Sequence, residues 1–235
     1  MSFESLPERL AQVRAELARR AAHPGGGAGG GGGRVTIVAV TKGFGTDAIR
    51  AAAAAGIGDI GENRVQEAVE KQDALRELSG IRWHLIGHLQ RNKARVAAGR
   101  FDLVHSLDSL ELARELDRRS TTPQRVLLQV NVARESQKSG CAPEEAPALA
   151  RQIAALEHLR LEGLMTLAPL TDDEDVQRRT FRGLRVLRDR IKEEEGVWLP
   201  TLSMGMSGDY ASAVAEGATV IRLGTVLFGP RVETP

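Results

Sequence analysis

Residues 34–61, RVTIVAVTKGFGTDAIRAAAAAGIGDIG, contain one complete strand–helix–strand pattern. The apolar, β-branched run at 35–41 predicts a buried strand, residues 46–55 predict a helix, and residues 57–61 predict a second strand. Glycines separate these segments, where turns are expected. Alternation of strand and helix is typical of a parallel sheet, because each helix carries the chain back to the edge where the next strand begins.

The same pattern continues along the chain and predicts eight strands, at 35–41, 57–61, 82–86, 103–105, 126–131, 161–165, 199–203 and 219–223. Helices are predicted between them, at 46–55, 64–78, 92–99, 109–119, 143–156, 173–195 and 208–216. Eight strands alternating with helices favour an α/β fold in which the sheet closes into a single (β/α)8, or TIM, barrel. An open, doubly wound sheet is the alternative.

Two features precede the predicted barrel. Residues 4–22 carry leucine and valine at helical spacing and predict an extra N-terminal helix. Residues 25–33 are glycine except for Ala28 and predict a flexible insert, since a phosphate-binding glycine loop would lead into a helix. We therefore divide the chain into 1–33, the helix and insert, and 34–235, one barrel domain with only a short tail after Leu223.

The composition narrows the function. Lys and Arg number 32 against 31 for Asp and Glu, so no basic surplus suggests a nucleic-acid partner. A single cysteine, Cys141, excludes an intrachain disulfide and suits a reducing cytoplasm. The N-terminus lacks a secretory signal, and no apolar run is long enough to cross a membrane. A cytoplasmic protein is predicted, and a monomer, because no unpaired apolar helix is evident.

Lysine is rare in this chain and occurs only at positions 42, 71, 93, 138 and 192. Lys42 ends the first predicted strand, and barrel active sites lie at the C-terminal ends of the strands. Partial burial there lowers the pKa of an ammonium group, and the neutral amine forms an imine with an aldehyde. The alternative is a lysine whose charged end simply reaches solvent from the strand end.

A phosphate site is predicted after the last two strands, where barrels often bind phosphate. The segments SMGMSGD (203–209) and RLGT (222–225) offer hydroxyls and accessible backbone N–H groups at Ser207, Gly208, Gly224 and Thr225. Ordinary turn chemistry at strand ends is the alternative. Arg222 lies inside an apolar strand and needs an acceptor. It could reach a ring nitrogen of a bound cofactor or pair with a carboxylate such as Glu162.

Other polar residues suggest no further site. His84 and His88 are four residues apart on a strand and its loop, without a companion carboxylate pattern, so no metal site is predicted. Glu62 is expected to begin a helix and to interact with its dipole. The acidic run at 172–175 is expected to be a solvated helix start, and Cys141 an inert thiol.

Seven segments, in order, resemble the YggS/PROSC family of pyridoxal 5′-phosphate (PLP) homeostasis proteins: AVTK (39–42), GENRVQE (61–67), WHLIGHLQRNK (83–93), NVARESQKSG (131–140), GLMTLAP (163–169), LSMGMSGDY (202–210) and IRLGTVLFG (221–229). The resemblance runs from about residue 35 to 229. It departs at the glycine insert and at Gly43 and Phe44, where the family often has another polar residue.

The resemblance implies a TIM barrel similar to the N-terminal domain of alanine racemase, with PLP as its cofactor. It implies a Schiff base on Lys42, phosphate binding by Ser207, Gly224 and Thr225, and an arginine, Arg222, that keeps the pyridine nitrogen unprotonated. Further residues fall in pocket motifs or match a lysine that takes part in PLP transfer; these are Asn63, Met165, Ser203 and Lys138.

The expected function is therefore intracellular PLP homeostasis without turnover, with apo-forms of PLP enzymes as transient partners. A PLP-dependent racemase and a cofactor-free Schiff-base aldolase are the alternatives. A two-base racemase needs an acid/base group on each face of its substrate, and alanine racemase relatives take one from a second domain. Tyr210, the only tyrosine, follows the predicted phosphate loop and is not expected to be catalytic.

Overall fold

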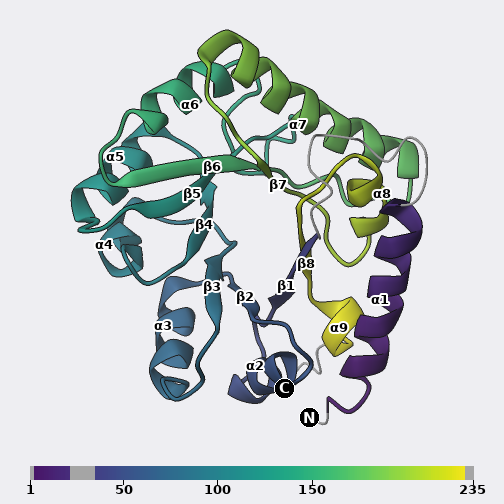
Figure 1. Ribbon diagram of the computed structural model, residues 1–235. Coiled ribbons are helices and arrows are strands. Elements are labelled where there is room, and N and C mark those ends of the chain that lie inside the picture. Colours follow the sequence, from purple (N-terminus) through teal and green to yellow (C-terminus); the bar gives the residue numbers. More distant parts are fainter. Residues whose placement is uncertain (1–2, 22–34, 231–235) are drawn as a thin grey trace.

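The computed structural model describes residues 3–21 and 35–230, and in these residues eight parallel strands close into a barrel in chain order (Figure 1). The last strand pairs with the first, with Val38 opposite Arg222. The strands are β1 Thr36–Val40, β2 Asp59–Glu62, β3 Arg82–Leu85, β4 Leu103–Leu107, β5 Gln124–Gln129, β6 Leu159–Met165, β7 Thr201–Ser203 and β8 Val220–Leu223. The predicted closed barrel is confirmed, and the open sheet is excluded.

Helices surround the strands (Figure 1). They are α1 Leu6–Ala21, α2 Thr46–Ala54, α3 Val65–Ala74, α4 Ala94–Ala97, α5 Leu110–Arg119, α6 Ala146–Ala154, α7 Glu174–Glu195, α8 Tyr210–Ala215 and α9 Thr225–Phe228, with a 3-10 turn, η1, at Arg91–Lys93. The predicted N-terminal helix is confirmed as α1. The predicted glycine insert at 25–33 lies outside the described residues.

Several boundaries differ from the sequence prediction. The helix expected at 92–99 is the 3-10 turn η1 followed by the single turn of α4. The helix expected at 208–216 begins only at Tyr210. The segment after Leu223, predicted as a tail, starts with helix α9. Glu62 ends strand β2 and does not begin a helix, so its side chain follows the alternation of the strand.

The interior of the barrel is separate from the core under the helices. The larger hydrophobic cluster joins helices to strands and includes Ile221 and Leu223 from β8. A smaller cluster contains Leu103, Leu127 and Met165, from the neighbouring strands β4, β5 and β6, and lies inside the barrel. This two-sided burial explains why the strands read as apolar runs, as expected for a parallel sheet covered by helices.

One glycine is required by the closure of the barrel. A Cβ at Gly163 would lie 2.0 Å from the carbonyl oxygen of Thr201 on the neighbouring strand, which is far inside van der Waals contact. Gly163 pairs with Thr201 in the β6–β7 ladder. Because a backbone atom cannot move aside as a side chain can, only glycine fits at this position.

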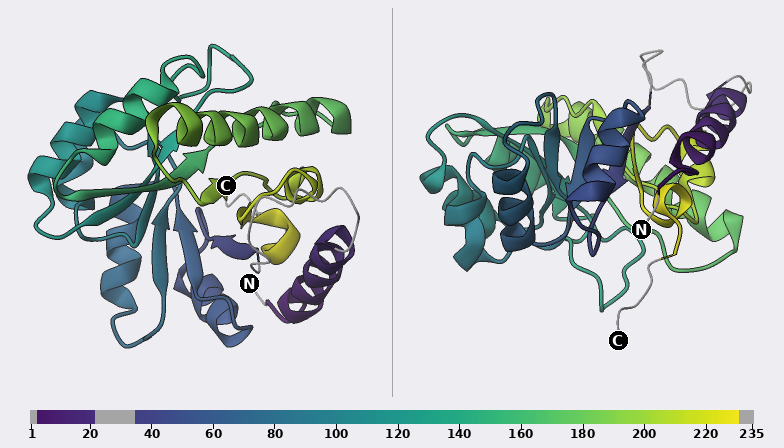
Figure 2. Two further views of the ribbon diagram at one scale, coloured as in Figure 1. Left: turned by 45° about the horizontal axis from the view of Figure 1, so that its top comes forward. Right: turned by 90° about the horizontal axis from the view of Figure 1, so that it is seen from below.

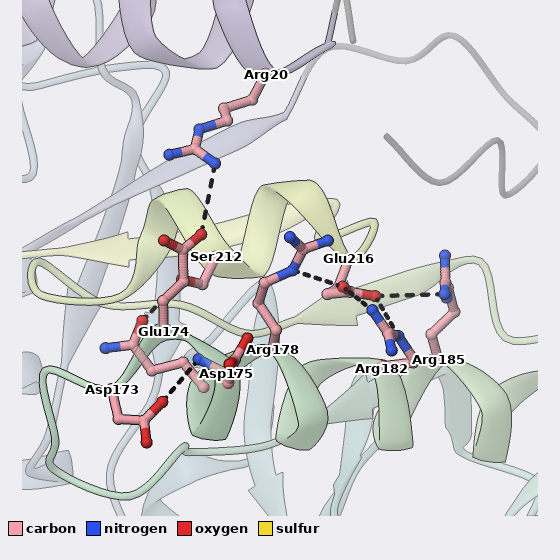
Figure 3. A network of polar contacts seen from close by, with 10 residues as sticks. Arg20, Asp173, Glu174, Asp175, Arg178, Arg182, Arg185, Ser212 and Glu216 are labelled. Atoms are coloured by element: carbon pink, nitrogen blue, oxygen red, sulfur yellow. Dashed lines mark hydrogen bonds and ion pairs between the residues drawn. The ribbon is translucent and has the colours of Figure 1, made fainter. Parts of the chain in front are cut away.

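Helices α1, α7 and α8 form one corner of the molecule, where α1 lies outside the barrel alongside α8 and α9 (Figure 2). Glu216, which follows α8, is 2% exposed and accepts hydrogen bonds from Arg178, Arg182 and Arg185 of α7 (Figure 3). Burial raises the pKa of Glu216, but the guanidinium groups of Arg182 and Arg178 outweigh it and hold the pKa below its usual value. This carboxylate therefore fixes α8, and the loop that precedes it, to α7.

The long helix α7 begins as the acidic run predicted. Asp173 accepts hydrogen bonds from the backbone of Asp175 and Val176, so it caps the helix. The helix ends at Gly196, whose φ of 68° is the left-handed conformation that glycine adopts most readily. No helix within residues 3–21 and 35–230 has both the length and the apolar character needed to cross a bilayer.

Candidate functional site

Lys42 follows strand β1 at the rim formed by the C-terminal ends of the strands. Its side chain is partly buried, and its turn is closed by a 3.0 Å hydrogen bond from the amide of Phe44 to the carbonyl of Thr41. The β1–β8 ladder sets Ala39 opposite Leu223, so the end of β8 lies beside the approach to Lys42. The lysine and the predicted phosphate segment therefore share one rim, at neighbouring strands.

A buried polar cluster anchors the residues on either side of Lys42. The Thr41 hydroxyl donates to Glu62 at 2.5 Å, and the Lys71 ammonium donates to both Glu62 and the Thr41 carbonyl, at 2.8 and 3.0 Å. Glu67 accepts from Lys71 and from the amide of Gly43. Lys71 thus stabilises the Lys42 turn, and the prediction that Glu62 serves a helix dipole was wrong.

Burial raises the pKa of Glu62, and the hydrogen bonds from Lys71 and Thr41 only partly oppose that effect. Glu67 is less buried. Desolvation raises the pKa of Glu67, but the hydrogen bonds from Lys71 and the Gly43 amide, together with the charge of Lys71, outweigh it, so the pKa is lowered. The two carboxylates thus differ in proton affinity although they share one ammonium group, and the more basic of them touches the residue before Lys42.

Three phenylalanines connect the Lys42 turn with the end of the barrel. The ring of Phe44 lies 5.3 Å from that of Phe228 in α9, and Phe3 lies 6.1 Å and 5.7 Å from these two rings, centroid to centroid. Aromatic rings at such distances pack favourably. Phe44 is therefore a packing residue that joins the lysine turn to α9.

The predicted phosphate segments meet at Ser207. Its hydroxyl oxygen accepts hydrogen bonds from the amides of Gly224 and Val226, at 3.1 and 3.3 Å. Two backbone N–H groups at the start of α9 thus converge on a single oxygen atom, which is the arrangement that a phosphate oxygen requires. Thr225 and Gly208 are exposed beside them, and a Cβ at Gly208 would meet open space.

The loop after β7 is held by hydrogen bonds to β8 and within the loop itself. The amide of Arg222 donates to the carbonyl of Gly205 at 2.9 Å, and Asp209 accepts a hydrogen bond from the amide of Met206. Gly205 has a φ of 95°, and a Cβ there would lie 2.6 Å from that of Ala213. Position 205 therefore requires glycine both for its backbone conformation and for the space it leaves to α8.

Arg222 is buried at the inner face of β8, with 3% of its surface exposed. It donates to the Ser203 hydroxyl at 2.6 Å and to the carbonyl of Thr166 at 2.9 Å. Burial lowers its pKa to about 10, with Asp209 acting in the opposite direction, so the guanidinium stays charged at neutral pH. Glu162 pairs instead with Arg125 at 2.8 Å, and this excludes it as the partner of Arg222.

Three further predicted residues occupy different parts of the rim. Asn63 follows β2, and a Cβ at Gly87 would lie 2.3 Å from its carbonyl, so the glycine lets two strand ends approach each other. Met165 is buried in the interior cluster at the end of β6. Lys138, in the segment between β5 and α6, donates to the Ala168 carbonyl at 2.6 Å and pairs with Glu135.

Asp209 was not predicted as a site residue. It is buried, and burial raises its pKa, while the backbone of Met206 and the charges of Arg222 and Lys138 lower it. The carboxylate thus lies within electrostatic range of the two cations predicted to handle the cofactor. A sequence signal was present, because an aspartate within a glycine-rich strand-end loop often hydrogen-bonds its own backbone.

The remaining sequence expectations concern metals and thiols. Among the residues that the structure describes, His, Cys, Asp and Glu nowhere gather in a group of three that could hold a metal ion. Cys141 is buried, and desolvation raises its pKa to about 12, so the thiol is unreactive at neutral pH as predicted. His84 has a neighbour that the sequence did not suggest, His105.

The fold and the rim define the class of this protein. The family model for the N-terminal domain of alanine racemase matches residues 29–232. Alanine racemase from Corynebacterium glutamicum superposes with a TM-score of 0.74 at 17% identity, covering 96% of this chain and 62% of the racemase. The protein is therefore a barrel of the alanine racemase N-terminal type.

Two relatives with higher identity define the family. The pyridoxal phosphate homeostasis protein of Pseudomonas aeruginosa is 43% identical over 232 residues, 97% of each chain. PipY of Synechococcus elongatus, solved with PLP bound, is 38% identical with a TM-score of 0.82 and covers 95% of this chain and 100% of its own. The chain belongs to the family of pyridoxal phosphate homeostasis proteins, as the sequence motifs predicted.

Proposed function

We propose that this protein binds PLP at the C-terminal rim of its barrel as a Schiff base on Lys42 and acts in PLP homeostasis without catalytic turnover. The observation that carries the proposal is the PLP-bound structure of PipY, a relative 38% identical over 95% of this chain. The rim geometry supports it, because a partly buried lysine, a buried arginine and two converging amides lie on neighbouring strand ends.

Each group at the rim suits one part of PLP. PLP supplies an aldehyde, and the Lys42 amine condenses with such a carbon. The amides of Gly224 and Val226, with Ser207, Gly208 and Thr225, bind the phosphate. Arg222 faces the ring nitrogen and, being a charged donor, disfavours protonation there, which makes the ring a poorer electron sink. Asn63 and Met165 border the ring.

The absence of turnover is supported by the position of Tyr210. A two-base racemase needs an acid/base group on each face of its substrate. Burial raises the pKa of Tyr210, and Arg19 and Arg20 of α1 act on it in the opposite direction. Tyr210 begins α8, which packs against α1, and its side chain packs against the core under the helices and not in the interior cluster of the barrel.

We further propose that the protein works in the cytoplasm as a monomer and passes PLP to apo-enzymes through transient contacts, with Lys138 taking part in the transfer. The single cysteine of the chain, buried and unreactive, suits a reducing compartment. Lys138 is supported as the transfer residue by its place in the segment beyond β5, where its charge acts on Asp209 of the phosphate loop.

The test compares visible absorption spectra of wild type, Lys42→Ala and a control, Lys192→Ala, after addition of PLP. Lys192 lies in the last turn of α7, over the ring of Trp198 at 4.8 Å, and is a lysine away from the rim. An imine band is expected in wild type and the control and not in Lys42→Ala. Borohydride reduction followed by peptide mass spectrometry then identifies the modified lysine.

Three outcomes would overturn parts of the proposal. A wild-type protein without the band, able to cleave a sugar phosphate, would be a cofactor-free aldolase. A band that persists in Lys42→Ala would move the Schiff base to another lysine. Reproducible racemisation of alanine that depends on Lys42 would make the protein an enzyme.

A further inference from the structure

Five buried polar side chains form an unbroken hydrogen-bonded chain through the inside of the barrel. Arg222 Nη1 lies 2.6 Å from Ser203 Oγ, Ser203 Oγ lies 2.9 Å from His105 Nδ1, His105 Nε2 lies 2.9 Å from His84 Nδ1, and His84 Nε2 lies 3.0 Å from Asp59 Oδ1. The relative exposures of these residues run from 0% at Ser203 and His105 to 7% at Asp59.

The chain must cross the barrel interior. Ser203 ends β7 and His105 lies in β4, and these strands are separated in the barrel by β5 and β6. A 2.9 Å contact between non-neighbouring strands of a closed barrel can only pass through its centre. The other three contacts join residues of neighbouring strands, so the chain runs from β8 to β2.

The hydrogens of this chain have one arrangement when Asp59 is ionised and each imidazole carries a single proton. The Asp59 carboxylate only accepts, so His84 donates to it from Nε2 and accepts on Nδ1. His105 then donates from Nε2 to His84, and its Nδ1 accepts the Ser203 proton. Ser203 accepts in turn from Arg222, because a guanidinium group only donates.

The charges around the chain favour this arrangement. Burial, with the positive charge of Arg222 nearby, holds the pKa of His105 well below its usual value, which keeps that ring neutral. Burial raises the pKa of Asp59, but hydrogen bonds from His84 and Arg82 outweigh it and lower the pKa to about 2. Arg82 binds both carboxylate oxygens of Asp59, so the far end of the chain is a fixed anion at the opposite rim.

This arrangement changes the role expected for Ser203. Its hydroxyl accepts from Arg222 and donates to His105, so its proton is committed to the chain and not to a cofactor. One terminal nitrogen of Arg222 donates a hydrogen bond to Ser203, and the other donates to the Thr166 carbonyl. Its remaining N–H bonds then point in directions set by these two acceptors.

We propose that His105, supported by His84 and Asp59, is a positioning residue that orients Ser203 and, through it, the Arg222 guanidinium toward the ring end of the bound cofactor. This inference rests on the proposed function for its cofactor, but the hydrogen arrangement is a property of the protein alone. The anion at Asp59 polarises each bond in the same direction, which strengthens the chain as a unit.

The first test uses the protein without cofactor. Nitrogen-15 NMR of the histidine rings distinguishes the two neutral tautomers, and the expected result is a protonated Nε2 and an unprotonated Nδ1 on both His84 and His105. A proton on Nδ1 of His105 would overturn the proposal, whether or not the protein binds PLP. This measurement therefore separates a failure of the chain from a failure of the proposed function.

The second test uses variants loaded with PLP. In His105→Phe the affinity for PLP is expected to fall about tenfold, as for the loss of one or two buried hydrogen bonds, and the absorption maximum of the bound cofactor to shift. The glutamine in His105→Gln offers a carbonyl oxygen as acceptor and an NH₂ group as donor. This variant is expected to restore most of the PLP affinity and most of the wild-type absorption maximum. Ser203→Ala, which removes a single oxygen, should reproduce the change if His105→Phe does not fold.

Leu103→Ala is the matched control, because Leu103 lies on the same strand inside the barrel and outside the chain. It is expected to lower the melting temperature and to leave the affinity and the absorption maximum as in wild type. Equal spectra and affinities in His105→Phe, Ser203→Ala and wild type would overturn the proposal. So would a shift in Leu103→Ala as large as that in His105→Phe, because it would reduce the effect to general destabilisation.

Discussion

Lys71 of α3 donates a 2.8 Å hydrogen bond to Glu62 at the end of β2, and both side chains are buried. This pair holds the carbonyl and hydroxyl of Thr41, the residue before Lys42, through two further hydrogen bonds. The buried ammonium of Lys71 is thus a structural group, whereas Lys42, at the end of β1, is the lysine for which we propose the Schiff base. The stability of the Lys42 turn depends on Lys71.

Replacement Lys71→Met is expected to destabilise the protein by about 3–5 kcal/mol, because it leaves the Glu62 carboxylate buried without its cation. Urea unfolding measures this change. Lys192→Met, at the surface over Trp198, is the control and should cost about 1 kcal/mol or less. Adding Glu62→Gln to Lys71→Met should recover part of the loss. Equal effects of the two lysine variants would show that the buried pair is not important for stability.

The sequence was sufficient to predict the barrel but not the contact between Lys71 and Glu62. Glycines and other turn residues separate the strands from the helices along the chain, so all eight strands could be located. Glu62 stands where strand changes to helix, and a shift of one residue in that boundary turns its side chain to the other face. Helix α9 has only four residues, Thr225–Phe228, which is too few for a helical period to be visible.

The hydrogen-bonded chain inside the barrel could not be predicted from the sequence for a different reason. His84 was compared with His88 because the two are close in sequence, yet its partner His105 lies 21 residues away on the next strand. Motif spacing cannot show such a contact, whereas the register of parallel strands does. The available signal was weaker: Asp59, His84, His105 and Arg222 are polar residues within strands of a closed barrel, and each needs a partner where it is buried.

Stability at acid pH should depend on Asp59. Its pKa is about 2 in the folded protein and 3.8 when free, so folding is stabilised by about 2 kcal/mol above pH 4, and this contribution is lost as the pH falls through 2. Between pH 5 and pH 3 the loss is about 1 kcal/mol. In urea unfolding, the difference between wild type and Asp59→Asn should shrink by this amount. A constant difference over that range would mean that Asp59 is not held ionised by His84 and Arg82.

Lys138 is expected to take part in the transfer of PLP to an apo-enzyme and not in the binding of PLP by this protein. The Lys138 ammonium, in the segment beyond β5 and away from the Lys42 turn, donates to the Ala168 carbonyl. The variant Lys138→Ala should therefore keep the absorption band that depends on Lys42. It should deliver PLP to an apo-enzyme more slowly than wild type. The rate at which apo-enzyme activity appears measures delivery. Lys93→Ala, in the 3-10 turn after β3, is the control. Delivery at the wild-type rate would remove Lys138 from the proposal.

The phosphate site can be tested with a charge. In Ser207→Asp a carboxylate would stand where the amides of Gly224 and Val226 converge, and it would repel the phosphate while accepting their hydrogen bonds. The affinity for PLP should fall by at least about tenfold, as like charges in contact cost several kcal/mol. Pyridoxal, which lacks the phosphate, should bind nearly as it does to wild type.

Ser207→Asn separates charge from size in this experiment, because its side chain matches that of aspartate and is neutral. Its affinity for PLP should lie between those of wild type and Ser207→Asp. Ser120→Ala, which removes a hydroxyl bonded to Leu116 at the end of α5, controls for the loss of a buried hydrogen bond elsewhere. If PLP and pyridoxal lost affinity equally in Ser207→Asp, the phosphate would have to bind away from α9, and the assignment of this end of the rim would fail.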